Sequence, residues 1–260
     1  MCVYVAFHKN FPLLTNDSKY QPLHVGKALS ELEACYVGDN SGDHISEKNP
    51  YFSELTGLYW IWKNTDSEWV GLCHYRRFFF CKKPTFPMKM RKFFESITGN
   101  GNFRSGIYYT SGIKSSWLIA TGPEIEQILD KYDAIVPVQR KLKYPVWKQY
   151  QRRHHIQDME MVKEILSTLY PSYTSAFDRV MKKKELFSYN MFVMKREFYN
   201  QYMSWLFSVL FELERKSDLT DYNAYQKRMF GFVSERLFDV WLTHNNLNYK
   251  TLPVLYFKSM

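Results

Sequence analysis

Apolar and polar positions divide the first half of the chain into short strand-like runs and one amphipathic stretch. Residues 2–7, 34–37 and 69–73 have the length and composition of strands. Between the last two, Asn49 and Pro50 are typical of an N-cap followed by proline in the first turn of a helix. Strand, helix and strand at these lengths predict a parallel βαβ arrangement. The helix carries one apolar stripe, formed by Tyr51, Leu55, Leu58, Tyr59 and Trp62.

The second half of the chain has a more helical pattern. Strand-like runs remain at 134–138 and 189–194, and helical periodicity dominates from residue 145. Between the two halves, residues 82–115 are irregular and polar and are expected to form a lid-like segment. The sequence therefore predicts an α/β fold with a largely helical C-terminal half. Helices are expected over 123–131, 198–213 and 222–244, the second of them apolar nearly all round and so central or in contact with a membrane or partner.

Composition restricts the class of protein. With 45% hydrophobic residues among 260, the chain is expected to be folded rather than disordered. No apolar run approaches the roughly 18 residues that span a bilayer, and the N-terminus has the pattern of a strand rather than a signal peptide. The four cysteines form no CxxC pair and are expected to be reduced packing residues in a cytoplasmic protein. The net charge of +9 suits nucleic acid, an anionic membrane or phosphorylated ligands.

Polar side chains follow each of the three expected strands of the first half. The carboxyl ends of parallel strands lie at one edge of a sheet, where open α/β sheets bind ligands. Arginine presents a planar fork of donors that matches phosphate, and an acidic residue after a second strand commonly binds a ribose hydroxyl. Together they predict a nucleotide-diphosphate site without a glycine-rich loop, although each residue alone is equally typical of a surface loop or cap. The residues are His8 and Lys9, then Asp39 and Asp43, then His74, Arg76 and Arg77.

A second candidate cluster lies at the start of the helical half. His154 and Asp158 are four residues apart, which on one helix face would pair a base with its orienting carboxylate. His155 takes the place of His154 if the helix phase is shifted, and an exposed basic helix start is the alternative interpretation. A zinc site is not expected, because no further ligand has the spacing of HExxH or CxxC.

A third candidate cluster belongs to the last expected helix. Glu235 and Arg236 lie in aromatic-rich surroundings, where burial without pairing would be costly. Glu235 is therefore either a catalytic carboxylate or half of an ion pair that braces the helix. Arg228 precedes this cluster and joins Arg236 as a candidate for sugar or acceptor binding. Asn190 is a further candidate for a sugar hydroxyl, or it caps a turn.

Long motifs in order along nearly the whole chain carry a resemblance to a known family. The chain is similar to a bacterial capsular and exopolysaccharide glycosyltransferase family, formerly filed as domain of unknown function 4422, some members of which are linked to galactofuranose transfer. The motifs are HVGK at 24–27, GD at 38–39 with GD at 42–43, ISEKNP at 45–50, ELTGLYWIWKN at 54–64, GLCHYRR at 71–77, NMF at 190–192 and GFVSERL at 231–237.

The resemblance implies a GT-A-like, Rossmann-like fold. Residues 1–144 would form the nucleotide-sugar-binding half and residues 145–260 a mainly helical acceptor-side half, packed as one domain. Most GT-A enzymes hold a divalent metal with Asp-x-Asp after the strand equivalent to 69–73, whereas this chain has His-Tyr-Arg-Arg at 74–77. Asp133 does not restore the motif, because Ala134 and Ile135 follow it. We therefore assign no cofactor and no metal ligand, leave dependence on Mn²⁺ or Mg²⁺ open, and expect cationic side chains to neutralise the leaving diphosphate.

The function implied is transfer of a sugar, galactofuranose or galactose, from a UDP-sugar to a growing capsule, O-antigen or exopolysaccharide. Arg76, Arg77, His74 and Lys9 would bind the diphosphate, and Asp39 with His8 and Asp43 the nucleoside. An inverting enzyme would need a base, for which we favour Glu235 and then the pair of His154 and Asp158.

The expected partners follow from that function. They are a nucleotide sugar, a glycan acceptor that is lipid-linked, and an anionic membrane, on whose inner face a cytoplasmic enzyme would lie peripherally. The alternatives are a non-catalytic basic module for RNA or polysaccharide and an inactive scaffold of a glycan-assembly complex. No RNP-like or KH-like motif supports RNA binding, so no nucleic acid is expected.

Overall fold

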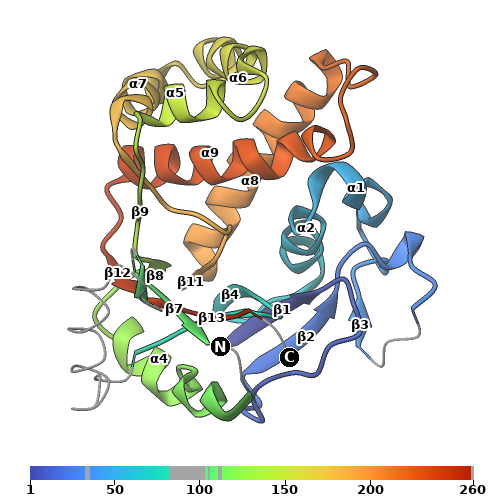
Figure 1. Ribbon diagram of the computed structural model, residues 1–260, viewed down its shortest axis with the longest axis vertical. Coiled ribbons are helices and arrows are strands. Elements are labelled where there is room, and N and C mark those ends of the chain that lie inside the picture. Colours follow the sequence, from blue (N-terminus) through green and yellow to red (C-terminus); the bar gives the residue numbers. More distant parts are fainter. Residues whose placement is uncertain (33–35, 82–102, 105, 111–112, 259–260) are drawn as a thin grey trace.

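The computed structural model describes residues 1–32, 36–81, 103–104, 106–110 and 113–258, and it has the expected α/β fold (Figure 1). Most of the predicted lid-like segment, together with Cys35, lies outside the described residues. Cys2 and Cys73 are buried free thiols. Among the helices of the described residues, none is long and apolar enough to cross a membrane.

Four parallel strands near the N-terminus form the part of the sheet nearest the candidate site. β1 (Cys2–Phe7) pairs in parallel with β2 (Tyr20–His24) and with β4 (Trp69–His74), and β2 pairs with β3 (Val37–Gly38). The parallel direction predicted for the strands on either side of the helix is confirmed, although β3 and β4 are not neighbours, because β2 and β1 lie between them. The carboxyl ends of these strands lie at one edge of the sheet. The sequence did not predict β2, because proline and polar residues interrupt its apolar pattern. Of the strand expected over 34–37, the structure describes residues 36 and 37, and β3 begins at Val37.

Strands from the second half of the chain enter the same sheet. β11 (Phe192–Lys195) lies between β4 and β8 (Ala134–Pro137) and is antiparallel to both. Gly71 permits this close pairing, because a Cβ there would lie 2.7 Å from Val193 Cγ2. Strands from before and after the boundary expected at residue 144 thus belong to one sheet. The assignment of donor binding to residues 1–144 and acceptor binding to residues 145–260 stays a prediction. The other strands are β5 (Arg77–Phe79), β6 (Phe103–Arg104), β7 (Ile107–Thr110), β12 (Tyr249–Leu252) and β13 (Val254–Phe257) in this sheet, and β9 (Arg140–Lys141) with β10 (Glu185–Leu186) as a separate pair.

The single helix expected after Asn49 is two helices in the structure. α1 (Asn49–Phe52) ends at Ser53, whose φ of 52° and ψ of −133° are not helical, and α2 (Leu55–Asn64) follows it. The Asn49 side chain stabilises the break by donating from Nδ2 to the Ser53 carbonyl at 2.8 Å. The apolar stripe passes through this junction without interruption, so periodicity alone could not reveal it.

The remaining helices cover the sheet in layers (Figure 1). α8 (Arg196–Lys216) and α9 (Met229–Asn245) lie with α2 on one face, and α4 (Gly122–Leu129) lies on the other. The central position expected for the long helix is confirmed, since Tyr199, Leu206 and Leu210 of α8 are fully buried. The last helix begins at Met229 rather than at residue 222. Outer helices are α5 (Val146–Gln151), α6 (Ile156–Leu169) and α7 (Thr174–Lys182), and short 3₁₀ turns span Lys27–Leu29, Ser46–Lys48, Ile113–Leu118, Pro171–Tyr173 and Gln226–Arg228.

Candidate functional site

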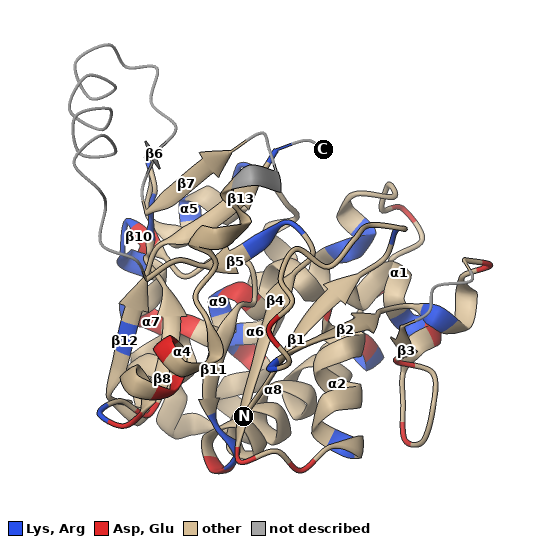
Figure 2. Cartoon of the chain, turned by 90° about the horizontal axis from the view of Figure 1, so that it is seen from below, with Lys and Arg blue, Asp and Glu red and all other residues tan. Residues whose placement is uncertain are grey.

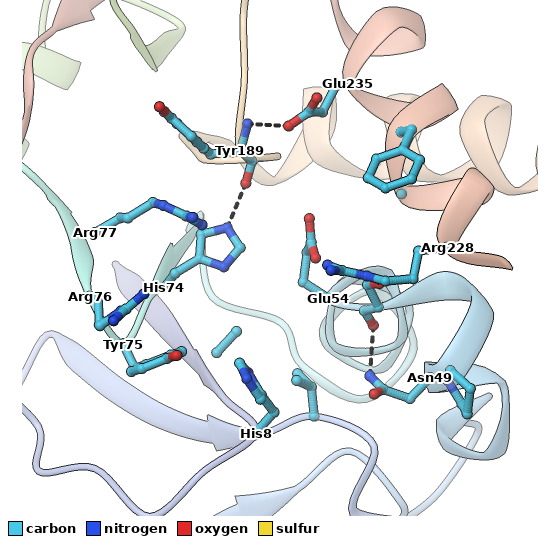
Figure 3. A pocket seen from close by; sticks show the side chains of 16 residues that line it. His8, Asn49, Glu54, His74, Tyr75, Arg76, Arg77, Tyr189, Arg228 and Glu235 are labelled. Atoms are coloured by element: carbon cyan, nitrogen blue, oxygen red, sulfur yellow. Dashed lines mark hydrogen bonds between the residues drawn. The ribbon is translucent and has the colours of Figure 1, made fainter. Parts of the chain in front are cut away.

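A cavity of about 560 Å³ opens at the carboxyl ends of β1 and β4 (Figure 3). The sheet edge forms one side of it, and the α1–α2 junction and the start of α9 form the other. Its position is the one predicted for ligands in an open α/β sheet. The side chains that argue for chemistry here are His8, Glu54, His74, Arg76, Arg77, Tyr189, Arg228 and Glu235.

The structure brings together part of the predicted set. Of the sequence candidates, six line the cavity: His8, His74, Arg76, Arg77, Arg228 and Glu235. Seven others are not among its lining residues: Lys9, Asp39, Asp43, His154, Asp158, Asn190 and Arg236. Sequence reasoning missed Glu54 and Tyr189, which also line it. Glu54 stands at the head of a recognised motif, but a helix surface was expected there.

Arg76 and Arg77, which we call the arginine side, lie on the edge of the sheet. Arg76 donates from Nη1 to the Lys258 carbonyl and from Nη2 to the Tyr256 hydroxyl, both at 3.1 Å. The Arg77 guanidinium carbon lies 4.7 Å from the centroid of the Tyr189 ring, and the buried Nε of Arg77 has no hydrogen-bond partner in the part of the chain that the structure describes. Neither arginine forms an ion pair with a carboxylate of the described residues. The arginine side therefore has positive charge available for an anion.

His74 lies next to the arginines but is not a cation at neutral pH. Its ring is buried, and burial lowers its pKa to about 4. Nε2 lies 2.5 Å from the carbonyl oxygen of Tyr189. A carbonyl can only accept, so Nε2 carries the proton and Nδ1 the lone pair. His74 thus holds the Tyr189 backbone, and the available charge resides on the arginines.

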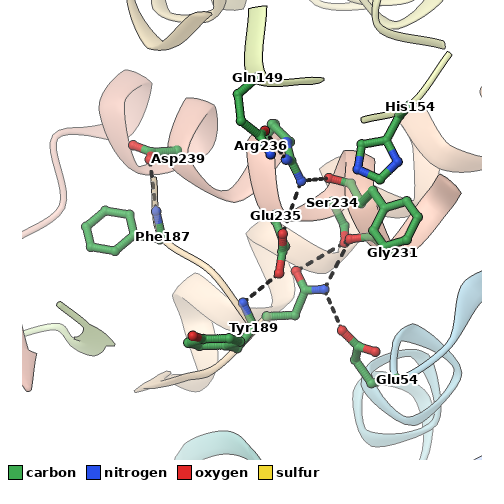
Figure 4. A network of polar contacts seen from close by, with 12 residues as sticks. Glu54, Gln149, His154, Phe187, Tyr189, Gly231, Ser234, Glu235, Arg236 and Asp239 are labelled. Atoms are coloured by element: carbon green, nitrogen blue, oxygen red, sulfur yellow. Dashed lines mark hydrogen bonds and ion pairs between the residues drawn. The ribbon is translucent and has the colours of Figure 1, made fainter. Parts of the chain in front are cut away.

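Glu54 and Glu235, which we call the carboxylate side, face the cavity from the helical elements. Glu235 accepts from the Tyr189 backbone N–H at 2.7 Å through Oε1, and from Arg236 Nη1 at 3.1 Å through Oε2 (Figure 4). Partial burial is the main cause that raises the pKa of Glu235. Arg236 is almost fully buried and also donates to Gln149 Oε1 at 2.7 Å. Glu235 is thus both the partner of Arg236 and a carboxylate of the cavity.

A turn at Tyr189 and Asn190 links the two sides. Both residues have positive φ, 83° and 49°, which is unusual outside glycine. The Asn190 side chain donates from Nδ2 to Glu54 Oε1 at 2.8 Å and accepts from the Ser234 hydroxyl at 3.1 Å (Figure 4). Asn190 therefore lies behind the cavity and positions Glu54, while the Tyr189 backbone joins His74 to Glu235.

The two aspartates after the second expected strand lie outside the cavity. Asp39 is fully buried and accepts from the backbone N–H groups of Gly26 and Lys27 at 2.9 and 3.1 Å, and from the Ser46 hydroxyl. Asp43 is exposed and accepts from the Tyr59 hydroxyl at 3.0 Å. Asp39 thus stabilises the turn after β2, and the nucleoside role of both residues stays a prediction.

The helical pair expected from His154 and Asp158 does not form. α6 begins at Ile156 with His155 as its N-cap, so His154 precedes the helix. Its Nδ1 lies 3.1 Å from Gln226 Oε1, and burial lowers its pKa to about 4. Asp158 instead accepts from the hydroxyls of Tyr150 at 2.8 Å and Tyr222 at 2.6 Å. The prediction of one shared helix face was wrong, because the chain turns just before α6.

The described residues contain no cluster of three His, Cys, Asp or Glu side chains that could hold a metal ion. Asp133 pairs with Lys195 at 2.8 Å rather than facing the cavity. Dependence on a metal ion stays open.

Comparisons with known proteins agree with this fold. No curated protein sequence matches the chain. The solved apo structure of the WbbM bifunctional glycosyltransferase is 30% identical to it, with a TM-score of 0.87. The alignment covers 99% of this chain and 45% of that one, so our chain spans less than half the length of its structural relative. The structural match relates the chain to a glycosyltransferase. A family described as domain of unknown function (DUF4422) matches residues 2–246, which confirms the resemblance noted in the sequence. The chain belongs to this family.

Proposed function

We propose that this chain is a glycosyltransferase that moves a sugar from a nucleotide-diphosphate donor to a glycan acceptor. The observation that carries the proposal is the cavity itself. Two arginines that form no ion pair with a carboxylate of the described residues lie on a sheet edge, opposite two carboxylates. Arginine forks suit a diphosphate, and carboxylates suit hydroxyl groups and their protons. The relationship to a bifunctional glycosyltransferase supports the same reading.

The donor is proposed to be a UDP-sugar, with galactofuranose or galactose as the transferred group. Arg76 and Arg77 bind the diphosphate, and Arg228 adds a third cation from the opposite side of the cavity. Lys9 is exposed beside His8, at the end of β1, where it would meet the nucleotide from outside the cavity. With the phosphates on the arginine side, the sugar would extend toward the carboxylate side.

Chemistry in an inverting reaction requires one proton acceptor. Glu235 is our candidate, because it lines the cavity and burial raises the proton affinity of its carboxylate. It takes the proton of the acceptor hydroxyl as the acceptor oxygen bonds to the anomeric carbon. The bond from that carbon to the phosphate oxygen breaks, and its electron pair leaves on the nucleoside diphosphate. Fixed positive charge of the arginine side stabilises this leaving group.

The acceptor is proposed to be a lipid-linked glycan of a capsule, O-antigen or exopolysaccharide, met at an anionic membrane. Lys and Arg are spread over many elements (Figure 2), but between Asp133 and Asp158 the chain has six of them and no acidic residue. All six are exposed: Arg140, Lys141, Lys143, Lys148, Arg152 and Arg153. Such a basic segment would add about 1 kcal/mol per charge near an anionic surface. Failure to sediment with anionic liposomes at low salt would contradict this part of the proposal.

A titration of the purified chain with UDP-, GDP- and CMP-sugars, with Mn²⁺ and then with EDTA, tests the function. Saturable binding of one UDP-sugar that survives EDTA supports a diphosphate site formed by arginines. Binding that requires Mn²⁺ keeps the glycosyltransferase and rejects the idea that arginines replace the metal. A chain that binds no donor but shows a steep salt-dependent affinity for RNA would be a basic binding module. Donor binding without turnover would indicate a scaffold.

A further inference from the structure

Glu54 lines the cavity and has one carboxylate oxygen that is engaged and one that is open. Its Oε1 accepts from Asn190 Nδ2 at 2.8 Å. Its Oε2 has no hydrogen-bond partner among the described residues, and the side chain lines the cavity. In the view of Figure 3 the carboxylate points into the cavity between His74 and Arg228. Glu235, by contrast, has both oxygens engaged by Tyr189 and Arg236.

Unusual backbone conformations hold Glu54 in this position. Ser53, directly before it, has a φ of 52°, and Asn190, which binds its carboxylate, has a φ of 49°. The conformation of Ser53, whose ψ is −133°, costs about 1–3 kcal/mol and persists where the surroundings enforce it, often at ligand sites. Asparagine adopts a positive φ more readily. The Ser53 hydroxyl accepts from Arg228 Nε at 3.0 Å, which ties the junction to a further side chain of the cavity. A carboxylate fixed from two separate elements is pre-organised to bind a ligand.

The chemistry of a free carboxylate oxygen identifies what it would bind. An ionised carboxylate only accepts hydrogen bonds, and a sugar hydroxyl is a donor that it holds strongly. It would repel a phosphate, so its ligand group is not the diphosphate. We propose that Glu54 binds a hydroxyl of the sugar being transferred through Oε2, and that it thereby sets which sugar the cavity accepts. This inference rests on the proposed function, because it presumes a nucleotide sugar whose diphosphate lies on the arginine side.

Comparison of UDP with UDP-sugars separates this role from a structural one. Calorimetric titrations of wild type and Glu54→Gln would use UDP, UDP-galactose and UDP-galactofuranose. Glutamine keeps an oxygen that can accept from Asn190 but removes the charge. We expect unchanged affinity for UDP and about 10- to 100-fold weaker binding of the preferred UDP-sugar, the scale of one hydrogen bond to a charged group. The matched control is Glu160→Gln, at an exposed position on α6, which should bind both as wild type does.

The outcomes separate failure of the proposed function from failure of the role proposed for Glu54. If wild type binds neither UDP nor either UDP-sugar, the proposed function fails and the role of Glu54 fails with it. Suppose instead that wild type binds UDP and a UDP-sugar. If Glu54→Gln lowers the affinity for both ligands equally, or for neither, the proposed function stands and the inference about Glu54 is overturned.

A measurement on wild type avoids any loss of folding in the variant. UDP-galactose analogues deoxygenated at one position each should include one that binds about 10-fold or more weakly, because it leaves Oε2 unpaired. Equal affinity for all of these analogues would overturn the inference.

Discussion

The arginine side and the carboxylate side of the cavity place their charges by different means. Arg76 and Arg77 follow a regular buried strand. Among the described residues, their guanidinium groups contact aromatic rings, a hydroxyl and a carbonyl, and neither forms an ion pair. Glu54 and Glu235 are held by hydrogen bonds from a turn with positive φ and from a buried arginine. One side keeps charge available, whereas the other fixes the direction of its groups. A diphosphate needs charge, and a sugar needs directed hydrogen bonds, so the difference matches the two parts of a nucleotide sugar.

The largest effect is expected when Glu235, the proposed proton acceptor on the carboxylate side, is replaced. Glu235→Gln keeps the size of the side chain and an oxygen for the Tyr189 N–H, but it cannot take a proton. We expect turnover to fall by about 10²- to 10⁴-fold, the usual contribution of a positioned base. Release of UDP from the donor identified by titration measures it, with Glu160→Gln as control. Wild-type turnover in this variant would remove Glu235 from the chemistry.

A variant on the arginine side tests the other half of the comparison. Arg76→Ala should lower turnover by at least about 10², the scale of one preorganised electrostatic contact. Because the proposed contact of Arg76 is with the diphosphate, UDP alone should also bind more weakly, which distinguishes this variant from Glu54→Gln. Arg215→Ala, in an exposed pair with Glu212, is the control for loss of an arginine. Normal activity of Arg76→Ala would contradict the proposed diphosphate site.

The arginine side could be predicted from sequence because its information is local. The apolar run of β4 leads directly into the histidine and arginines, so strand, edge and charge follow one another within nine residues of the chain. The parallel pairing of β1 and β4 then places His8 beside them. Asp39 follows its strand in the same way, yet its side chain turns to the backbone of the loop after β2. Position after a strand therefore predicted the edge, not the direction of each side chain.

The carboxylate side could not be predicted because it depends on tertiary contacts. Glu54 stands within an amphipathic stretch, and nothing in its periodicity marks the break at Ser53. The turn at Tyr189 contains no glycine to signal positive φ. Its conformation depends on Glu235 and Ser234, which lie more than 40 residues further along the chain. A strand was expected from residue 189, but it begins at Phe192, because Tyr189 and Asn190 form a turn with positive φ.

His74 joins the two sides and should make the stability of the chain depend on pH. Its pKa is about 4 in the folded protein, against an ordinary value of 6.5. The unfolded chain therefore binds the proton first as pH falls, and stability is lost between about pH 6.5 and pH 4. The shift corresponds to about 3 kcal/mol. His74→Gln retains an N–H for the Tyr189 carbonyl, and we expect its free energy of unfolding to fall less over this range.

Denaturant titrations at several pH values between 4 and 7 measure the difference. Partly buried carboxyls whose pKa is raised, such as Glu235 and Asp158, act in the opposite direction, but they are present in both proteins and cancel in the comparison. His155→Gln, at an exposed position, is the control for loss of a histidine. Parallel profiles for wild type and His74→Gln would contradict a buried neutral ring.

The smallest effect is expected from relieving the strained backbone at Ser53, the residue before Glu54. Ser53→Gly removes a side chain from a backbone conformation that favours glycine, so stability should rise by about 1 kcal/mol after the entropy cost of glycine in the unfolded chain. The same change deletes the hydroxyl that accepts from Arg228, and activity should fall several-fold. Asn246→Gly is the matched control, because Asn246 also has a positive φ of 49° but caps the end of α9 away from the cavity. It should stabilise the chain without loss of activity. If Ser53→Gly stabilises the chain and leaves turnover intact, the conformation at Ser53 is a feature of folding alone, and the carboxylate side does not depend on it.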